Sequence, residues 1–386
     1  MNITKRDDTF VMNTYRRFPV EIVSGKGSVA YDSEGKEYID LGSGIGVTAF
    51  GYCDETWQKA VIAQLNKVQH TSNLYYTEPC GKLAELLCGK TGLKKVFFCN
   101  SGAEANECII KAARKYAEDV RGIKEPVIVT LLNSFHGRTI TTLAATGQEH
   151  YHEAFQPLTP GFIHVPANDA EAFRAVSENE KIAGILLECV QGEGGVVPLD
   201  PDYVKAVAEI AKEKDILLMI DEVQTGNGRT GQYFAYQNFG VAPDLVSTAK
   251  GLGGGLPLGA ALFGEKVEKI LGFGDHGSTF GGNPVCTAGA VSVVERIDDA
   301  FLAEVRRKSA HIFETFSGAK GVKSVSGQGL MIGILPERPA GDIVNECIGR
   351  GVLCLTAKDK VRLLPALNIP DDVLDRALAV LLDVLS

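Results

Sequence analysis

Residues 245–255 read LVSTAKGLGGG, a short run of strand-forming residues followed by a single lysine and a series of glycines. A run of this length without regular polar alternation is typical of a strand buried on both faces of a mostly parallel sheet. Lys250 therefore follows the end of a buried strand, where loss of hydration lowers the pKa of an amine and makes it nucleophilic. Taken alone, the residue is also compatible with an ordinary surface lysine.

The glycines after Lys250 let the backbone come close to a ligand. They do not form a Walker loop, because no Gly-Lys-Ser/Thr follows at the required spacing. They also do not match the dinucleotide fingerprint, since Leu256 stands where the third glycine would be. The stretch therefore argues against a nucleotide-binding protein and against a dinucleotide-dependent dehydrogenase.

Similar strand-forming runs recur between about residues 57 and 296, and amphipathic segments lie between them. Because the runs are apolar throughout, they predict strands in a mostly parallel sheet. The predicted strands are 95–99, 127–132, 184–189, 216–220, 245–248 and 260–264, and the predicted helices include 104–120, 202–214, 301–316 and one that begins at Asp371.

The 386 residues exceed the usual size of a single core, so we expect two domains. The alternating segments predict a large α/β domain over residues 57–290. Short strands before residue 56 and the mixed segment after it predict a smaller α+β domain built from residues 1–56 and 291–386. In open α/β sheets, ligands bind at the carboxyl ends of the strands, which directs attention to the residues there.

Two of these strand ends carry groups that can hold an anion or a cation. Ser101, Gly102 and Ala103 lie between a strand and a helix, where a hydroxyl and backbone N–H groups suit a phosphate. A plain helix cap is the alternative interpretation. Asp221 ends an apolar strand and needs a cation or a donor there, although a loop cap is again possible. Glu222 would point to the opposite face.

Another strand end reads NSFHGRT over residues 133–139. Phe135 can stack on a planar ring, and Arg138 can hold a carboxylate in a bidentate fork. A core phenylalanine and a surface arginine are the alternatives. Together the strand ends supply a phosphate cradle, a stacking ring, a carboxylate for a pyridinium nitrogen and an amine for an aldehyde. Pyridoxal 5'-phosphate requires these four groups in one place.

With these residues assembled, nearly the whole chain resembles the class III aminotransferases of the aspartate-aminotransferase-like fold, also called fold type I. Within that class it is most similar to the acetylornithine aminotransferase group. The stretches that carry the resemblance are residues 13–19, 100–107, 134–139, 188–195, 221–226, Lys250 with its glycines, 278–284 and 361–365. The resemblance implies a large domain with a seven-stranded, mostly parallel sheet.

The resemblance implies the cofactor pyridoxal 5'-phosphate and a role for each residue around it. Lys250 would carry the cofactor as a Schiff base and later move a proton, and Asp221 would pair with the pyridinium nitrogen. Thr279 would reach the phosphate of a neighbouring subunit, which implies a homodimer with shared sites. The remaining implied contacts are Phe135 on the ring, Gln224 near the phenolic oxygen, and Ser101, Gly102 and Ala103 on the phosphate.

The same resemblance implies how the substrates bind. Arg138 would bind the distal carboxylate of either substrate, and Arg362 the α-carboxylate of 2-oxoglutarate or glutamate. Glu193 would pair with Arg362 while the amine substrate is bound, because an unpaired buried arginine is costly. Tyr15 would line the substrate pocket. Ile45 stands where ornithine aminotransferases carry a tyrosine, which argues against free ornithine.

The implied reaction is transamination of N2-acetylornithine with 2-oxoglutarate to N-acetylglutamate 5-semialdehyde and glutamate, a step of arginine biosynthesis. Succinylornithine, ornithine, 4-aminobutyrate and acyl-lysine derivatives are alternative amines. A non-catalytic protein that binds a phosphate ligand on the same fold is the alternative from another class. The presence of Lys250, Asp221 and Arg138 together argues against that alternative.

Composition limits the partners and the compartment. The net charge of −9 and the lack of any Lys/Arg block argue against nucleic acid. No stretch approaches the ~18 apolar residues of a membrane span, and the N-terminus has no apolar signal core. Nine cysteines without a C-x-x-C pair are typical of buried thiols in the cytoplasm. His150 and His152 lack accompanying ligands, so we expect no metal site.

Overall fold

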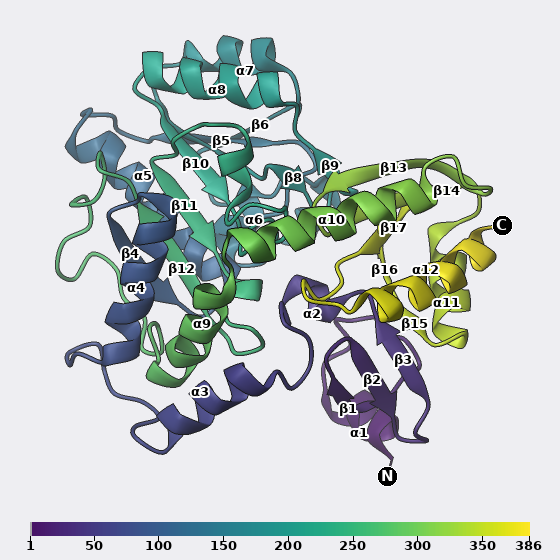
Figure 1. Cartoon of the computed structure of the whole chain (residues 1–386). Coiled ribbons are helices and arrows are strands. Elements are labelled where there is room, and N and C mark those ends of the chain that lie inside the picture. Colours follow the sequence, from purple (N-terminus) through teal and green to yellow (C-terminus); the bar gives the residue numbers. More distant parts are fainter. Residues whose placement is uncertain (1) are drawn as a thin grey trace.

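The computed structural model describes residues 2–386, and its centre is a seven-stranded sheet in the order β4-β12-β11-β10-β7-β5-β6 (Figure 1). The strands are β4 (Lys95–Cys99), β5 (Val127–Leu131), β6 (Phe162–Val165), β7 (Ile182–Leu187), β10 (Leu217–Asp221), β11 (Leu245–Thr248) and β12 (Gly259–Phe263). Within this sheet β12 is antiparallel to both of its neighbours, so the other six strands share one direction.

Helices cover both faces of the sheet, as continuous apolar strands require. Along β10 the side chains alternate: Leu218 and Ile220 join the core on one face, and Leu217 and Met219 join the core on the other. Burial of each such side chain contributes roughly 1.5–3 kcal/mol. Helix α5 (Gly102–Asp119) covers the second face. The first face packs against α4 (Glu78–Thr91), α7 (Ala170–Ser177), α8 (Pro201–Glu213) and α9 (Pro284–Arg296).

The two ends of the chain meet in smaller sheets beside the large one (Figure 1). One sheet has the order β1-β2-β3-β15, in which the C-terminal strand β15 pairs in parallel with the N-terminal strand β3. The other has the order β13-β14-β17-β16. These strands are β1 (Ile22–Lys26), β2 (Val29–Asp32), β3 (Glu37–Asp40), β13 (Val322–Gln328), β14 (Met331–Pro336), β15 (Val352–Leu353), β16 (Leu355–Ala357) and β17 (Lys360–Leu363). The domain boundaries at residues 56 and 290 stay predictions.

The remaining elements are short or lie at the ends of the chain. The helices are α1 (Ile3–Phe10), α2 (Ser43–Gly46), α3 (Glu55–Leu65), α6 (Ile140–Ala145), α10 (Asp299–Phe316), α11 (Ala340–Gly349) and α12 (Asp371–Leu385). The short elements are the 3-10 turns η1 (Glu149–Tyr151), η2 (Ala235–Asn238) and η3 (Lys250–Leu252), and the hairpin of β8 (Val190–Gln191) and β9 (Val197–Pro198). Among residues 2–386 no helix combines the length and apolar character that crossing a bilayer requires.

A buried arginine joins the large sheet to the C-terminal unit. Arg229 lies in the turns after β10, and its Nη1 donates hydrogen bonds to the carbonyl oxygens of Leu330 (3.0 Å) and Pro365 (2.6 Å). Leu330 lies between β13 and β14, and Pro365 follows β17. Burial lowers the pKa of Arg229 to about 9, still well above neutrality. The charged guanidinium therefore ties the strand that carries Arg362 to the end of β10.

Candidate active site

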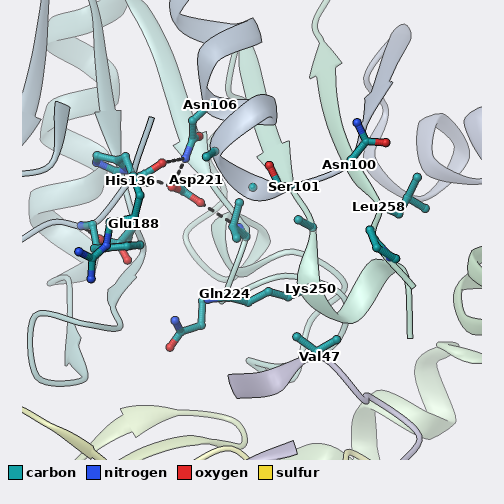
Figure 2. A pocket seen from close by; sticks show the side chains of 18 of the residues that line it. Val47, Asn100, Ser101, Asn106, His136, Glu188, Asp221, Gln224, Lys250 and Leu258 are labelled. Atoms are coloured by element: carbon teal, nitrogen blue, oxygen red, sulfur yellow. Dashed lines mark hydrogen bonds and ion pairs between the residues drawn. The ribbon is translucent and has the colours of Figure 1, made fainter. Parts of the chain in front are cut away.

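The carboxyl ends of five strands and the start of β12 surround one cavity of about 440 Å³. Because β12 is antiparallel, its first residues lie at the same edge of the sheet as the last residues of its neighbours. Figure 2 shows the polar side chains that point into this space. Eight of the predicted site residues line it: Ser101, Gly102, Ala103, Phe135, Arg138, Asp221, Gln224 and Lys250. A volume of this size suits a small cofactor and its substrate.

Lys250 is the basic residue at the centre of the site. Its backbone has a φ of 47°, in the left-handed region that non-glycine residues rarely adopt. Such strain is typical of functional positions that the surrounding structure holds in place. Burial lowers the pKa of Lys250 to about 8, although the nearby charge of Glu193 opposes this change. A substantial fraction of the amine is therefore neutral and nucleophilic near physiological pH.

The glycine turn after Lys250 packs against the single tryptophan of the chain. Trp57 Nε1 donates a hydrogen bond to the carbonyl oxygen of Gly253 (3.1 Å). At Gly254, which has a φ of 60°, a Cβ atom would lie 2.9 Å from the same indole nitrogen. The indole and the glycine turn therefore pack directly against each other beside the lysine.

Asp221 is held by three donors at the end of β10. Its Oδ2 accepts hydrogen bonds from Asn106 Nδ2 (2.7 Å) and His136 Nδ1 (2.8 Å), as Figure 2 shows. Its Oδ1 accepts one from the backbone N–H of Val223 (2.9 Å). Asn106 is itself oriented, because its Oδ1 accepts from Ser247 Oγ (2.6 Å). The carboxylate is nearly inaccessible to solvent, yet its donors offset the desolvation that burial imposes.

The turn at Ser101 begins helix α5 and leaves room for a ligand. Ser101 is the N-cap of α5, and its side chain accepts from the backbone N–H of Glu104 (3.2 Å). A Cβ atom at Gly102 would lie 2.5 Å from Val223 Cγ1, so this position tolerates only glycine without rearrangement. The exposed N–H groups at the start of an 18-residue helix favour a phosphate.

The loop after β5 carries the aromatic ring and the arginine predicted for this site. Its backbone is fixed by Glu188, whose carboxylate accepts hydrogen bonds from the N–H groups of Phe135 (3.0 Å) and Gly192 (3.3 Å). Burial raises the pKa of Glu188 to about 7, against the opposing influence of His136. Phe135 is half-buried at the cavity, and Arg138 is exposed at its mouth.

Glu193 and Arg362 form an ion pair next to the cavity, with 2.5 Å between Oε1 and Nη1. Gln224 contacts both: its Nε2 lies 3.4 Å from Glu193 Oε1, and its Oε1 lies 3.3 Å from Arg362 Nη1. Burial alone would raise the pKa of Glu193, but the charge and hydrogen bond of Arg362 outweigh it and keep that pKa low. Arg362 Nε is buried without a partner among the described residues. The pair therefore leaves one donor of the arginine unsatisfied.

Of the four predicted site residues that do not line the cavity, Glu193 and Arg362 lie next to it, and the other two are exposed elsewhere on the chain. Thr279 is exposed in the loop before α9, and Tyr15 is exposed on the segment after α1. The prediction that no metal is bound stays untested, but residues 2–386 contain no cluster of three His, Cys, Asp or Glu side chains suited to one. His152 instead contacts the carbonyl oxygen of Leu143 through Nε2 (2.9 Å).

Three site residues are not identified from the sequence: Asn106, His136 and Glu188. A buried asparagine among the apolar positions of α5 is a signal that Asn106 has a polar partner. His136 and Glu188 stand within the motif stretches, but nothing in their spacing indicates that they face Asp221 and the Phe135 loop.

Comparison with known proteins identifies the family of this chain. The sequence matches the family described as aminotransferase class-III over residues 10–385. The chain belongs to the class-III aminotransferases. This confirms the family and the fold type predicted from the motifs.

Several curated relatives of this class-III aminotransferase are named acetylornithine aminotransferases. The protein of Haemophilus ducreyi is 51% identical over all of this chain and 98% of its own length. That of Methanocaldococcus jannaschii is 45% identical over 94% of this chain and 93% of its own.

Solved structures of aminotransferases are also similar to this chain. An N-acetylornithine aminotransferase from Stenotrophomonas maltophilia has a TM-score of 0.86 at 34% identity, covering 99% of this chain and 98% of that one. An ornithine aminotransferase from Toxoplasma gondii with partial occupancy of pyridoxal phosphate has a TM-score of 0.94 at 29% identity, covering 99% and 93%.

The cofactor of this class-III aminotransferase is pyridoxal 5'-phosphate. The residues of the cavity fit it, because they include a buried amine, a carboxylate held by three donors, and a helix start that a Cβ atom at Gly102 would disturb. An aldehyde, a pyridine nitrogen and a phosphate require groups of these types.

Proposed function

We propose that this enzyme transfers the δ-amino group of N2-acetylornithine to 2-oxoglutarate, forming N-acetylglutamate 5-semialdehyde and glutamate, as arginine biosynthesis requires. The observation that carries the proposal is the ion pair of Glu193 and Arg362 beside Lys250. N2-acetylornithine has no carboxylate next to its reacting carbon, whereas 2-oxoglutarate has one. The site therefore needs an arginine whose charge is neutralised while the first substrate is bound and free while the second is bound. The names of relatives such as that of Haemophilus ducreyi support the same substrate.

In this proposal Lys250 does the proton chemistry. When bound, the cofactor supplies an electron sink for the charge that develops on the substrate carbon. The amine of Lys250 takes the proton from that carbon, since its lowered pKa leaves it partly neutral. Burial excludes water, which keeps the proton on the lysine until it is returned.

Other residues hold the cofactor in place. Asp221, fixed by Asn106 and His136, would pair with the pyridine nitrogen and keep it protonated. Phe135 would stack on the ring, and Gln224 would hold the phenolic oxygen; both residues line the cavity. The turn formed by Ser101, Gly102 and Ala103 would bind the phosphate through N–H groups and a hydroxyl.

Substrate selection depends on two arginines. Arg138 binds the distal carboxylate, which is the α-carboxylate of N2-acetylornithine and the γ-carboxylate of 2-oxoglutarate. Arg362 binds the α-carboxylate of 2-oxoglutarate after Glu193 releases it. While the amine substrate is bound, Glu193 neutralises Arg362, which avoids an unpaired buried charge. Tyr15 would complete the substrate pocket.

We also propose a homodimer in the cytoplasm. An exposed apolar patch, the dimer patch, combines Leu74, Tyr75 and Tyr76 with Phe280. Its two segments are linked, since Asn73 Nδ2 donates to the carbonyl oxygens of Ser278 and Gly281. Exposed apolar patches of this kind usually mark protein interfaces. Thr279 lies within this region, which supports its proposed contact with the partner's phosphate. All nine cysteines are free thiols, as a reducing compartment favours.

The test is glutamate formation from 2-oxoglutarate with a panel of amines, using wild type and Lys250→Ala. We expect the highest kcat/KM for N2-acetylornithine over succinylornithine, ornithine and 4-aminobutyrate. Lys250→Ala should lower kcat by at least about a thousandfold, because it removes the acid–base group. Lys115→Ala, at a half-buried residue of α5 that does not line the cavity, is the matched control and should retain activity. A higher kcat/KM for another amine would show that this amine, and not N2-acetylornithine, is the preferred substrate. An active Lys250→Ala variant would refute the mechanism.

A further inference from the structure

A cluster of aromatic rings contacts the arginine at the mouth of the cavity. Arg138 Cζ is 4.1 Å from the ring centroid of Tyr151 and 5.5 Å from that of Phe135. The rings of Phe135 and Tyr151 meet edge to face, 5.8 Å apart. Tyr151 also contacts His150, with 3.9 Å between the ring centroids. Tyr151 ends the 3-10 turn η1 and comes from a different segment than the loop that carries Arg138.

These rings are the main contacts that hold the guanidinium. Within residues 2–386 the side chain of Arg138 has neither an ion pair nor a hydrogen bond, and it is exposed to solvent. A free arginine side chain samples many rotamers, and ordering it opposes ligand binding. A guanidinium over an aromatic face is attracted by the ring and keeps its N–H groups free at the edge. The stacked position therefore prepares Arg138 for a bidentate contact with a carboxylate.

We propose that Tyr151 is a positioning residue that holds Arg138 ready for the distal carboxylate and thereby favours substrates that carry one. This inference rests on the proposed function, since it takes Arg138 as the group that binds this carboxylate. The ring, not the hydroxyl, provides the contact with Arg138. Loss of the ring weakens binding of ligands with a distal carboxylate and leaves ligands without it unchanged.

The binding test uses the holoenzyme and two ligands that differ in the distal carboxylate. Calorimetry gives the Kd of glutarate, which has two carboxylates, and of butyrate, which has one. We expect Tyr151→Leu to raise the Kd of glutarate by about threefold to thirtyfold, the range of a cation–π contact, and to leave butyrate unchanged. Tyr151→Phe keeps the ring and should resemble wild type. Tyr31→Leu, on strand β2 away from the cavity, is the matched control.

The kinetic test compares pairs of substrates in which one member carries the distal carboxylate and the other lacks it. Tyr151→Leu should lower kcat/KM for 2-oxoglutarate relative to pyruvate, and for N2-acetylornithine relative to N-acetylputrescine, chiefly through KM. Adding Arg138→Leu to Tyr151→Leu should abolish the remaining discrimination, whereas Tyr151→Leu in an Arg138→Leu background should cause no further loss. This non-additivity would show that Tyr151 acts through Arg138.

Three outcomes would overturn the inference: an unchanged Kd of glutarate in Tyr151→Leu, equal losses of affinity for glutarate and butyrate, or a Tyr151→Phe variant as weak as Tyr151→Leu. Equal losses would indicate a merely structural role. The proposed function is tested separately by the amine panel. If wild type turns over none of those amines while Tyr151→Leu still weakens glutarate alone, the proposed substrate is wrong and the role of Tyr151 stands.

Discussion

Lys250 has a strained backbone and a buried amine, and both follow from its place in the turn after β11. The sequence predicts the amine at a buried strand end, and this environment lowers its pKa as expected. It does not predict the left-handed backbone, because that conformation depends on packing against segments far away in the chain, including Trp57 beneath the glycines.

The pKa of Lys250 predicts the pH dependence of cofactor attachment. The neutral amine is the nucleophile, so the rate at which cofactor-free enzyme attaches pyridoxal 5'-phosphate should rise with pH and level off above about 8. An ordinary lysine would level off only above about 10.4. Because Glu193 raises this pKa, Glu193→Gln should move the midpoint to lower pH. Stopped-flow absorbance between pH 6 and 10 measures the rate; a steep rise persisting beyond pH 9.5 would contradict the prediction.

For Asp221, the sequence predicts that hydrogen-bond donors are present but does not predict which residues supply them. A carboxylate at the end of an apolar strand predicts that donors surround it, and the structure provides them. Their identity is not predictable, since Asn106 lies 115 residues and His136 85 residues away in the chain. Only the assembled sheet edge brings them to the same oxygen.

At the scale of elements, the strongest apolar runs are predicted well and the weaker ones are not. The structure has β4 and β11 at their predicted bounds. Strand β7 begins and ends two residues before its predicted range, although Lys181 and Glu188 flank it directly and mark its ends in the sequence. Strand β6 is missed, since four residues with a histidine among them give a weak pattern. The antiparallel direction of β12 has no signal in an apolar run.

The start of α5 gives a prediction about two elements that touch. Gly102→Ala places a methyl group against Val223 at the end of β10, and overpacking of this kind lowers stability by about 1–3 kcal/mol. It should also weaken binding of pyridoxal 5'-phosphate, because the turn at Ser101 must shift. Urea unfolding and titration of the cofactor by absorbance measure the two effects.

Two further variants separate a local clash from a general effect on helices. Val223→Ala in the same chain should restore most of the loss, as the methyl groups that collide are gone. Gly89→Ala in α4, where a Cβ atom would meet nothing within 4 Å, should be neutral or stabilising. If Val223→Ala gives no rescue, the steric explanation is wrong.

At the scale of the whole molecule, the sequence predicts that the chain ends form one small domain, and its boundaries stay a prediction. In the structure the C-terminal strand β15 pairs in parallel with the N-terminal strand β3. The junction with the large sheet is not predicted. A buried arginine bonded only to carbonyl oxygens, such as Arg229, has no recognisable pattern in a sequence, because its partners Leu330 and Pro365 contribute backbone and not side chains.

The dimer patch gives a prediction about assembly. Tyr76→Glu places a charge in the exposed apolar patch and should weaken self-association by at least about tenfold, as changes at interface aromatics commonly do. Activity should fall with the dimer, because Thr279 would no longer reach the partner's site. Sedimentation equilibrium measures the association. Val120→Glu, at an exposed apolar residue outside the patch, is the control, and a wild-type dimer in Tyr76→Glu would argue against this interface.

Because Trp57 contacts the glycines after Lys250, its intrinsic fluorescence can report on the active site. Since Trp57 is the single tryptophan of the chain, indole emission originates at one point, directly beneath the turn that carries the reactive lysine. Its intensity and wavelength therefore follow events at that turn without any attached dye. Filling and emptying of the site become visible in the unmodified enzyme.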